Sequence, residues 1–281
     1  MEPAQPRAGR TANAITVTAL NHYPIKSCAG TALTEAALGP RGILHDREFV
    51  LVEAATGTFL TQRELPPLAL IRPTLTDGRL HLAAPEMPPL TIPIATRGDA
   101  RDIVVWRDTC PAIDQGPESA AWFTAFLGLD CRLMRMAEDH QRQVDPAYAE
   151  IGDQVGFADG FPVLLISEES LADLNSRLET PLPMNRFRPN VVVAGAGEPY
   201  QEDGWTRITI GEASGVAFRV VKSCARCAIT TTDQATAARG KEPLRTLATY
   251  RKGERGVYFG QNLIHDAPGT LRLGDVVRVT S

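Results

Sequence analysis

The sequence predicts a mainly β protein (α+β), and two observations carry this prediction. Short β-branched runs recur along the chain and are separated by Gly and Pro, which is typical of strands joined by turns. The 281 residues also include 21 prolines, and proline interrupts the hydrogen bonding of long helices. We therefore expect many short strands with a few flanking helices.

The first third of the chain predicts an antiparallel, barrel-like sheet that ends in a helix. Residues 1–13 contain Pro, Gly and Arg without an apolar stretch, so we expect a disordered arm and no secretory signal. A helix is expected over 117–128, because Pro117 and Glu118 suit a first turn and Gly128 suits a helix end. Strands are predicted over 14–20, 46–53, 69–75 and 102–106.

The second half alternates helices and strands. Residues 137–154 are polar and poor in branched side chains, which indicates a long surface loop able to cover a site. Ser167 is a typical N-cap, and leucines on one face predict a helix over 167–178. A proline and spaced leucines predict another helix over 241–252. Strands are predicted over 190–194, 206–210, 217–222, 258–264 and 275–280.

Charge and composition exclude several classes of function. A net charge of -4 and a pI near 5.8 argue against binding to nucleic acid or an anionic membrane through bulk electrostatics. Any anionic ligand must therefore be held by local cations. The apolar stretch 161–166 is far too short to cross a bilayer, so no membrane span is expected. Five cysteines, an odd number, suit a reducing compartment and predict a cytoplasmic location.

Cys224 and Cys227 form a C-x-x-C pair with several possible meanings. Structural zinc needs three or four ligands at tight spacing, and the five histidines form no H-x-x-x-H pair. A redox dithiol usually lies where a strand enters a helix, whereas residues 228–233 are rich in Thr and Ile and predict extended backbone. Taken alone, the pair is best interpreted as two small, partly buried hydrophobic residues at a strand end.

Neighbouring motifs favour another interpretation. Seven segments stand out in order along the chain: YPIKSCAG (23–30), HDREFVLV (45–52), SEESLADLNSRL (167–178), RFRPNVVV (186–193), CARCAITTTD (224–233), KEPLRTLATYR (241–251) and FGQNLI (259–264). With these segments the chain resembles the MOSC family of molybdenum-cofactor domains, in the branch with an N-terminal β-barrel that includes the amidoxime reducing components. This resemblance implies a β-barrel-like N-terminal domain over 14–130 and a MOSC β-barrel over 131–281.

The resemblance implies a molybdenum–molybdopterin cofactor and a metal-ligating Cys227. A thiolate is a soft donor that suits this metal, and Arg226 could stabilise the deprotonated sulfur. Cys224 would then be a packing neighbour. Asp233 is a candidate catalytic proton donor, although an Asp at a strand end commonly bonds its own backbone.

Ten positions match cofactor contacts of the family. Arginine suits the pterin phosphate because its planar fork can bind two oxygens, whereas lysine offers a point charge. Taken singly, such residues are more often solvated charges or turn residues. The ten positions are Lys26, Ser27, Arg47, Asp159, Gly160, Phe161, Arg188, Asn190, Arg226 and Asn262.

The predicted function is the reduction of small N-hydroxylated compounds, as in relatives of the family. The chain carries no C-x-x-x-x-C-x-x-C segment, so we expect electrons from a separate flavin, haem or iron–sulfur protein. One alternative is a protein that carries the cofactor or relays sulfur from Cys227 without reducing a substrate. Another is a redox-sensing thiol protein with a reversible bond between Cys224 and Cys227.

Overall fold

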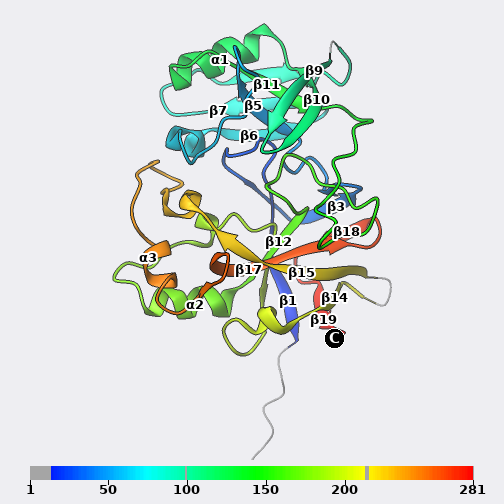
Figure 1. Cartoon of the computed structure of the whole chain (residues 1–281), viewed down its shortest axis with the longest axis vertical. Helices are drawn as coiled ribbons and strands as arrows, with labels where there is room; N and C mark the ends of the chain where they lie inside the picture. Colours follow the sequence, from blue (N-terminus) through cyan, green and yellow to red (C-terminus); the bar gives the residue numbers. More distant parts are fainter. Residues whose placement is uncertain (1–13, 99, 213–214, 281) are drawn as a thin grey trace, which may run out of the picture.

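Strands dominate the computed structural model, which describes residues 14–98, 100–212 and 215–280 (Figure 1). The predicted mainly β class is confirmed. The predicted disordered arm, residues 1–13, lies outside the described residues. Figure 1 shows an upper lobe of cyan and green strands and a lower lobe in which the first strand, in blue, meets the last strands, in red.

Seven strands of the lower lobe close into a barrel. β1 comes first in the chain but pairs with β13 and β19, so a strand from the N-terminus belongs to a barrel made mostly by the second half. Apolar side chains such as Val17, Ile208 and Phe218 fill the core. In pairing order the strands are β12 (Val163–Ser167), β13 (Val191–Ala194), β1 (Ile15–His22), β19 (Val276–Val279), β14 (Arg207–Ile210), β15 (Val216–Arg226) and β17 (Gly256–His265), which pairs with β12 again.

Short strands extend this barrel at its edges. β2 (Thr31–Leu33) pairs with β1, and β16 (Lys252–Gly253) pairs with β17. A separate three-stranded sheet joins β18 (Gly269–Arg272), β3 (Glu35–Gly39) and β4 (Gly42–Ile43).

The upper lobe is a half-barrel of antiparallel strands covered by one helix. The predicted helix is confirmed as α1 (Pro117–Leu127), which ends at Gly128 in the left-handed conformation. Its Trp122 and Phe123 pack into the core of this lobe. One sheet contains β5 (Phe49–Glu53), β11 (Cys131–Met136), β10 (Asp108–Asp114) and β9 (Ala100–Val105), and the other contains β6 (Arg72–Thr76), β7 (Arg79–Ala83) and β8 (Leu90–Pro93).

α2 (Glu168–Ser176) begins as predicted, with Ser167 as its N-cap. The Ser167 hydroxyl accepts from the Ser170 backbone N–H at 3.2 Å and donates to the carboxylate of Glu202 at 2.9 Å. Glu202 is fully buried. Among the described residues, none of the helices combines the length and apolar character that crossing a membrane requires.

Replacing Ser167 by Ala should lower the free energy of unfolding by about 2 kcal/mol. The change removes an N-cap, which contributes up to about 2 kcal/mol, and leaves a buried carboxylate short of one donor. Urea denaturation followed by circular dichroism measures the loss. Ser176→Ala is the matched control, because this exposed hydroxyl only donates to the Asp173 carbonyl. Equal stabilities of the two variants would contradict the assigned cap.

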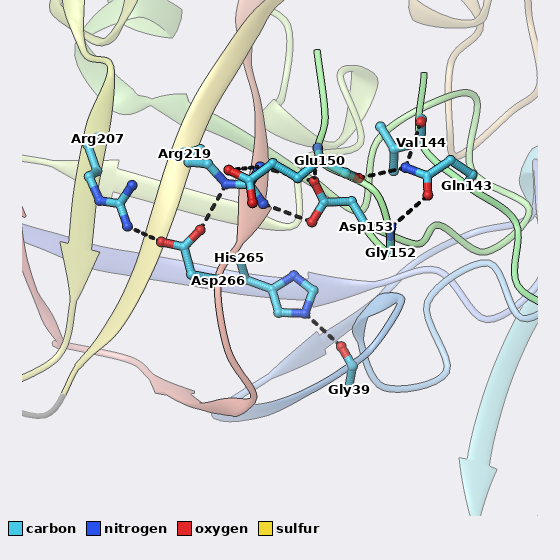
Figure 2. A network of polar contacts seen from close by, with 10 residues as sticks. All are labelled: Gly39, Gln143, Val144, Glu150, Gly152, Asp153, Arg207, Arg219, His265 and Asp266. Atoms are coloured by element: carbon cyan, nitrogen blue, oxygen red, sulfur yellow. Dashed lines mark hydrogen bonds and ion pairs between the residues drawn. The ribbon is translucent and has the colours of Figure 1, made fainter. Parts of the chain in front are cut away.

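The predicted long loop over 137–154 is confirmed, and ion pairs fasten it to the barrel (Figure 2). Arg219 of β15 donates to both carboxylate oxygens of Asp153, at 2.8 and 3.0 Å, and to Asp266 at 2.8 Å. Earlier in the loop, Arg142 donates to the carbonyls of Gly156 and Ala158 at 2.8 and 2.7 Å. These contacts fix the chain immediately before residues 159–161.

Two local predictions are wrong, for different reasons. The helix predicted over 241–252 is only one turn, α3 (Leu244–Leu247), because residues 252–253 instead pair with β17 as strand β16. The extended backbone predicted over 228–233 is a 3-10 helix at Ala228–Thr231. There the Thr230 and Thr231 hydroxyls donate to carbonyls three residues back, at 2.9 and 2.8 Å, which stabilises a turn despite the β preference of threonine.

Two of the predicted strands begin later than expected. Residues 46–53 form a strand only from Phe49, as β5. Residues 66–70 form a 3-10 helix that opens on two prolines, so the strand predicted over 69–75 begins at Arg72. Proline fixes the backbone in a conformation that suits the first residues of a helical turn.

Candidate cofactor site

All ten predicted cofactor contacts line one cavity together with Cys227. They come from separate segments of the chain, which follow β1, precede β5, β12 and β13, or lie at the end of β15 and within β17. The cavity and its open mouth, with the solvent space included, enclose about 750 Å³. The remaining lining residues are Ala158, Leu164, Phe187, Cys224, Ala225 and Ile229.

Three lining residues have strained backbone. Ser27, Arg47 and Arg188 have positive φ values of 70, 47 and 56°. Positive φ is uncommon outside glycine, and each such residue costs on the order of 1–3 kcal/mol. Strain of this kind persists where the surrounding structure fixes it, and it concentrates at functional sites. The positive φ values set the direction in which these three side chains leave the backbone.

Two guanidinium groups pack on one tyrosine ring. The Arg47 and Arg188 guanidinium carbons lie 4.2 and 4.3 Å from the centre of the Tyr23 ring. Arg188 is buried and donates to the Cys28 carbonyl at 2.6 Å. Burial, with a smaller contribution from Arg47, lowers the pKa of Arg188 to about 10. Asp46 pairs with Arg47 at 2.5 Å. Two neighbouring guanidinium groups thus have one adjacent carboxylate between them, and an anion bound here would reduce the repulsion between the two cations.

A chain of ion pairs holds the loop at residues 158–161. The Lys26 ammonium, in a side chain only 5% exposed, donates to the Phe157 carbonyl at 2.7 Å and pairs with Asp159 at 2.5 Å. Arg63 pairs with the other Asp159 oxygen at 2.7 Å. Burial alone would raise the pKa of Asp159, but Lys26 and Arg63 outweigh it and hold that pKa well below its usual range. Asp159 is therefore ionised and occupied with these two cations.

Arg63 is a neighbour of the cavity that no sequence motif indicated. Burial lowers the pKa of Arg63, but Asp159 and Cys227 outweigh it and the pKa lies above its usual value. Arg63 therefore lies beside the Cys227 sulfur as well as the Asp159 carboxylate. Its guanidinium also covers the Trp106 ring, with its carbon 4.7 Å from the ring centre. The residue lies in TQR (61–63), which carries no pattern that would single it out.

The two cysteines have different surroundings. Cys224 lies within β15, whereas Cys227 follows the last residue of that strand. Arg226 donates to the Cys224 sulfur at 3.0 Å and to the Phe187 carbonyl at 2.6 Å. Arg226, the cation expected to stabilise Cys227, thus contacts Cys224 instead, and Arg63 is the cation beside Cys227. Both thiols are free and partly exposed.

Comparisons with known proteins identify the family. The profile of the MOSC N-terminal beta barrel domain matches residues 14–130, and that of the MOSC domain matches residues 152–278. Mitochondrial amidoxime-reducing component 1 of Mus musculus is 39% identical to this chain, over 98% of the chain and 85% of that protein. The chain belongs to the MOSC family.

Two further MOSC relatives carry different names. Mitochondrial amidoxime-reducing component 1 of Homo sapiens is 38% identical over 93% of this chain and 82% of its own length. The molybdenum cofactor sulfurase of Danio rerio is 33% identical over 90% of this chain but only 32% of its own length. Of these two names, that of the sulfurase mentions the molybdenum cofactor.

The donor set of the cavity fits that cofactor. The lining includes four cations, Lys26, Arg47, Arg188 and Arg226, against Asp159 as its one acid, in a protein whose net charge is -4. The Nε atom of Arg226 is buried without a partner, so the wall retains an unused donor. Within the described ranges no group of three or more His, Cys, Asp or Glu residues could hold a metal ion by itself. A metal here would need ligands from a cofactor besides the Cys227 sulfur.

Two asparagines of the MOSC cavity have different surroundings. Asn190 is buried, and its side-chain oxygen accepts from Arg47 at 3.0 Å and from the Leu164 N–H at 3.2 Å. Its amide nitrogen donates to the Asn21 carbonyl at 3.2 Å. Asn190 therefore holds Arg47 in place and joins β12 to the end of β1. Asn262 lies on β17 opposite Leu164 of β12.

Asp233 lies outside the cavity lining. Its carboxylate pairs with Arg186 at 2.8 Å and accepts from the Ala235 and Thr236 N–H groups at 3.0 and 2.9 Å. Burial would raise its pKa, but these hydrogen bonds and Arg186 outweigh it and lower the pKa. The geometry thus gives Asp233 a part in ordering the turn that follows the cysteine segment.

Proposed function

We propose that this MOSC protein is a molybdenum-cofactor-dependent reductase of small N-hydroxylated compounds. The observation that carries the proposal is the convergence of the partly exposed Cys227 thiol, with Cys224 beside it, and four cations around one cavity. When bound, the cofactor would supply two-electron redox chemistry at a metal. In the overall reaction the N–O bond breaks, and two electrons and two protons convert the N-hydroxyl compound to the amine or amidine and water.

Different residues of the cavity would bind different parts of the cofactor. Arg47 and Arg188 would hold the phosphate of the pterin, because their guanidinium groups lie together against Tyr23 and can each offer two donors. Cys227 would ligate the metal. The Lys26–Asp159–Arg63 ion pairs would keep the loop at 158–161 in place as the wall of the cavity.

Electrons would come from a separate flavin, haem or iron–sulfur protein, as predicted from the sequence. The names of the amidoxime-reducing relatives support a reductase. Those names also place the relatives in mitochondria, and the cytoplasmic location predicted here from the cysteines stays a prediction.

The similarity to a molybdenum cofactor sulfurase, of which the chain spans about a third, favours a second candidate. In it the protein carries the cofactor, or relays sulfur through the partly exposed Cys227, and reduces no substrate.

One preparation separates these functions. The protein is produced in a host that makes the cofactor and analysed for molybdenum and pterin. It is then supplied with benzamidoxime and reduced methyl viologen. A reductase should contain near-stoichiometric molybdenum and form benzamidine. Transfer of intact cofactor to an apo-enzyme without benzamidine formation would instead establish the carrier, and absence of molybdenum together with a Cys224–Cys227 disulfide would establish a redox-sensing protein.

A further inference from the structure

A basic segment borders the cavity in an otherwise acidic protein. Residues 234–256 contain six Lys or Arg and two Glu, whereas the whole chain has a net charge of -4. Two of the six cations are neutralised, since Arg245 pairs with Glu242 and Arg251 with Asp203. The other four are exposed and make no ion pair with any described residue: Arg239, Lys241, Lys252 and Arg255. We call these four the basic rim.

The backbone places the basic rim on both sides of Cys227. On one side, Arg239 bridges Thr232, just beyond the 3-10 turn that starts after Cys227. On the other, Lys252 pairs with Val257, which in turn pairs with Arg226. In Figure 1 the orange chain around α3 forms the left side of the molecule and reaches toward the upper lobe.

Side chains of the rim also touch groups next to the cavity. Arg239 donates to the Gln62 carbonyl at 2.6 Å, and the Gln62 amide donates to the carbonyl of Ser27 at 2.6 Å. Arg255 donates to the Tyr148 hydroxyl at 2.8 Å, and the Tyr148 ring meets the ring of Phe161 edge-on at 5.9 Å. Ser27 and Phe161 both line the cavity, so Arg239 and Arg255 are each separated from the lining by a single residue.

We propose that the basic rim is the docking surface for an acidic electron-transfer protein, which rests on the proposed reductase function. Electron transfer weakens steeply with distance, so a donor must settle over Cys227, and the rim supplies charges where such a partner would arrive. Exposed rim charges of this kind steer association and select the partner by the sign of its charge. Because the remainder of the chain is acidic, an acidic donor is repelled elsewhere and directed to this face.

Charge reversal at two rim lysines tests the proposal. The exposed side chains of Lys241 and Lys252 make no hydrogen bond, ion pair or ring contact with described residues, so K241E/K252E should leave the fold intact. Flavodoxin, an acidic flavin protein, serves as the donor probe for the cofactor-loaded enzyme. At low ionic strength, kcat/KM for flavodoxin should fall about tenfold, and the difference should shrink as salt screens the charges. Turnover with reduced methyl viologen should not fall.

The matched control reverses two exposed cations of the upper lobe, R79E/R101E. Arg79 and Arg101 lie in β7 and β9 and form no ion pair with described residues. An equal loss of kcat/KM for flavodoxin in both double variants, or no loss in either, would contradict the proposed docking surface. If the wild type reduces no substrate with either flavodoxin or methyl viologen, the proposed reductase function is wrong. Flavodoxin binding measured by calorimetry then tests the docking surface separately. Weaker binding of K241E/K252E than of R79E/R101E supports it, and equal binding refutes it.

Discussion

Cys227→Ala should abolish reduction of benzamidoxime. Changes to groups that merely orient a metal ligand typically cost roughly 10–100-fold in affinity or activity, so removal of the ligand itself should cost more than about 100-fold. Cys227 is partly exposed and lies outside the apolar core, so the fold should persist. Turnover with reduced methyl viologen, molybdenum content and the urea midpoint are measured on the same preparation.

Cys224→Ala is the matched control for this prediction. Cys224 has the same side chain three residues earlier, and its sulfur only accepts from Arg226 in β15. We expect it to keep most of its activity and its molybdenum. Full activity of Cys227→Ala with bound cofactor would refute the assignment of the ligand, and equal losses in both variants would point to a role for the pair.

Local sequence patterns predicted the elements whose signals are local. Ser167 caps α2 and Gly128 ends α1 because a cap depends on a few neighbouring residues. The closure of the barrel was beyond such patterns, since β1 pairs with β13 across more than 170 residues. The helix predicted over 241–252 failed for a more local reason, because residues 252–253 form a tight hairpin with residues 256–257 at the start of β17.

The cavity residues were predicted from the family resemblance rather than from their own chemistry. Nothing local distinguishes Arg188 from a solvated arginine, and its burial beside Tyr23 appears only in the folded chain. Arg63 was missed because the upper lobe brings it to Cys227 from a segment without a motif. Asp233 shows the opposite failure: it follows the cysteine motif in sequence but directs its carboxylate to its own turn and to Arg186.

Arg188→Gln should change cofactor content and apo-protein stability in opposite directions. The cofactor would lose one of two guanidinium groups for its phosphate, so molybdenum and pterin content should fall about tenfold, since a hydrogen bond to a charged group contributes on the order of 1.5–3 kcal/mol. In the apo protein the same change removes a buried cation whose pKa is lowered by burial and by Arg47. Glutamine can still donate to the Cys28 carbonyl, so the midpoint of thermal unfolding should stay or rise.

The opposite signs separate a binding role from a structural one. A residue kept for stability would lower the unfolding midpoint of the apo protein when replaced, and cofactor loss would simply follow. Arg188→Lys sharpens the distinction, because lysine keeps the charge but loses the planar fork that stacks on Tyr23 and offers two donors. We expect intermediate cofactor content for Arg188→Lys. A clear drop in the thermal unfolding midpoint of apo Arg188→Gln would show that Arg188 stabilises the fold. In that case the contacts of Arg188 in the apo protein would outweigh its repulsion with Arg47.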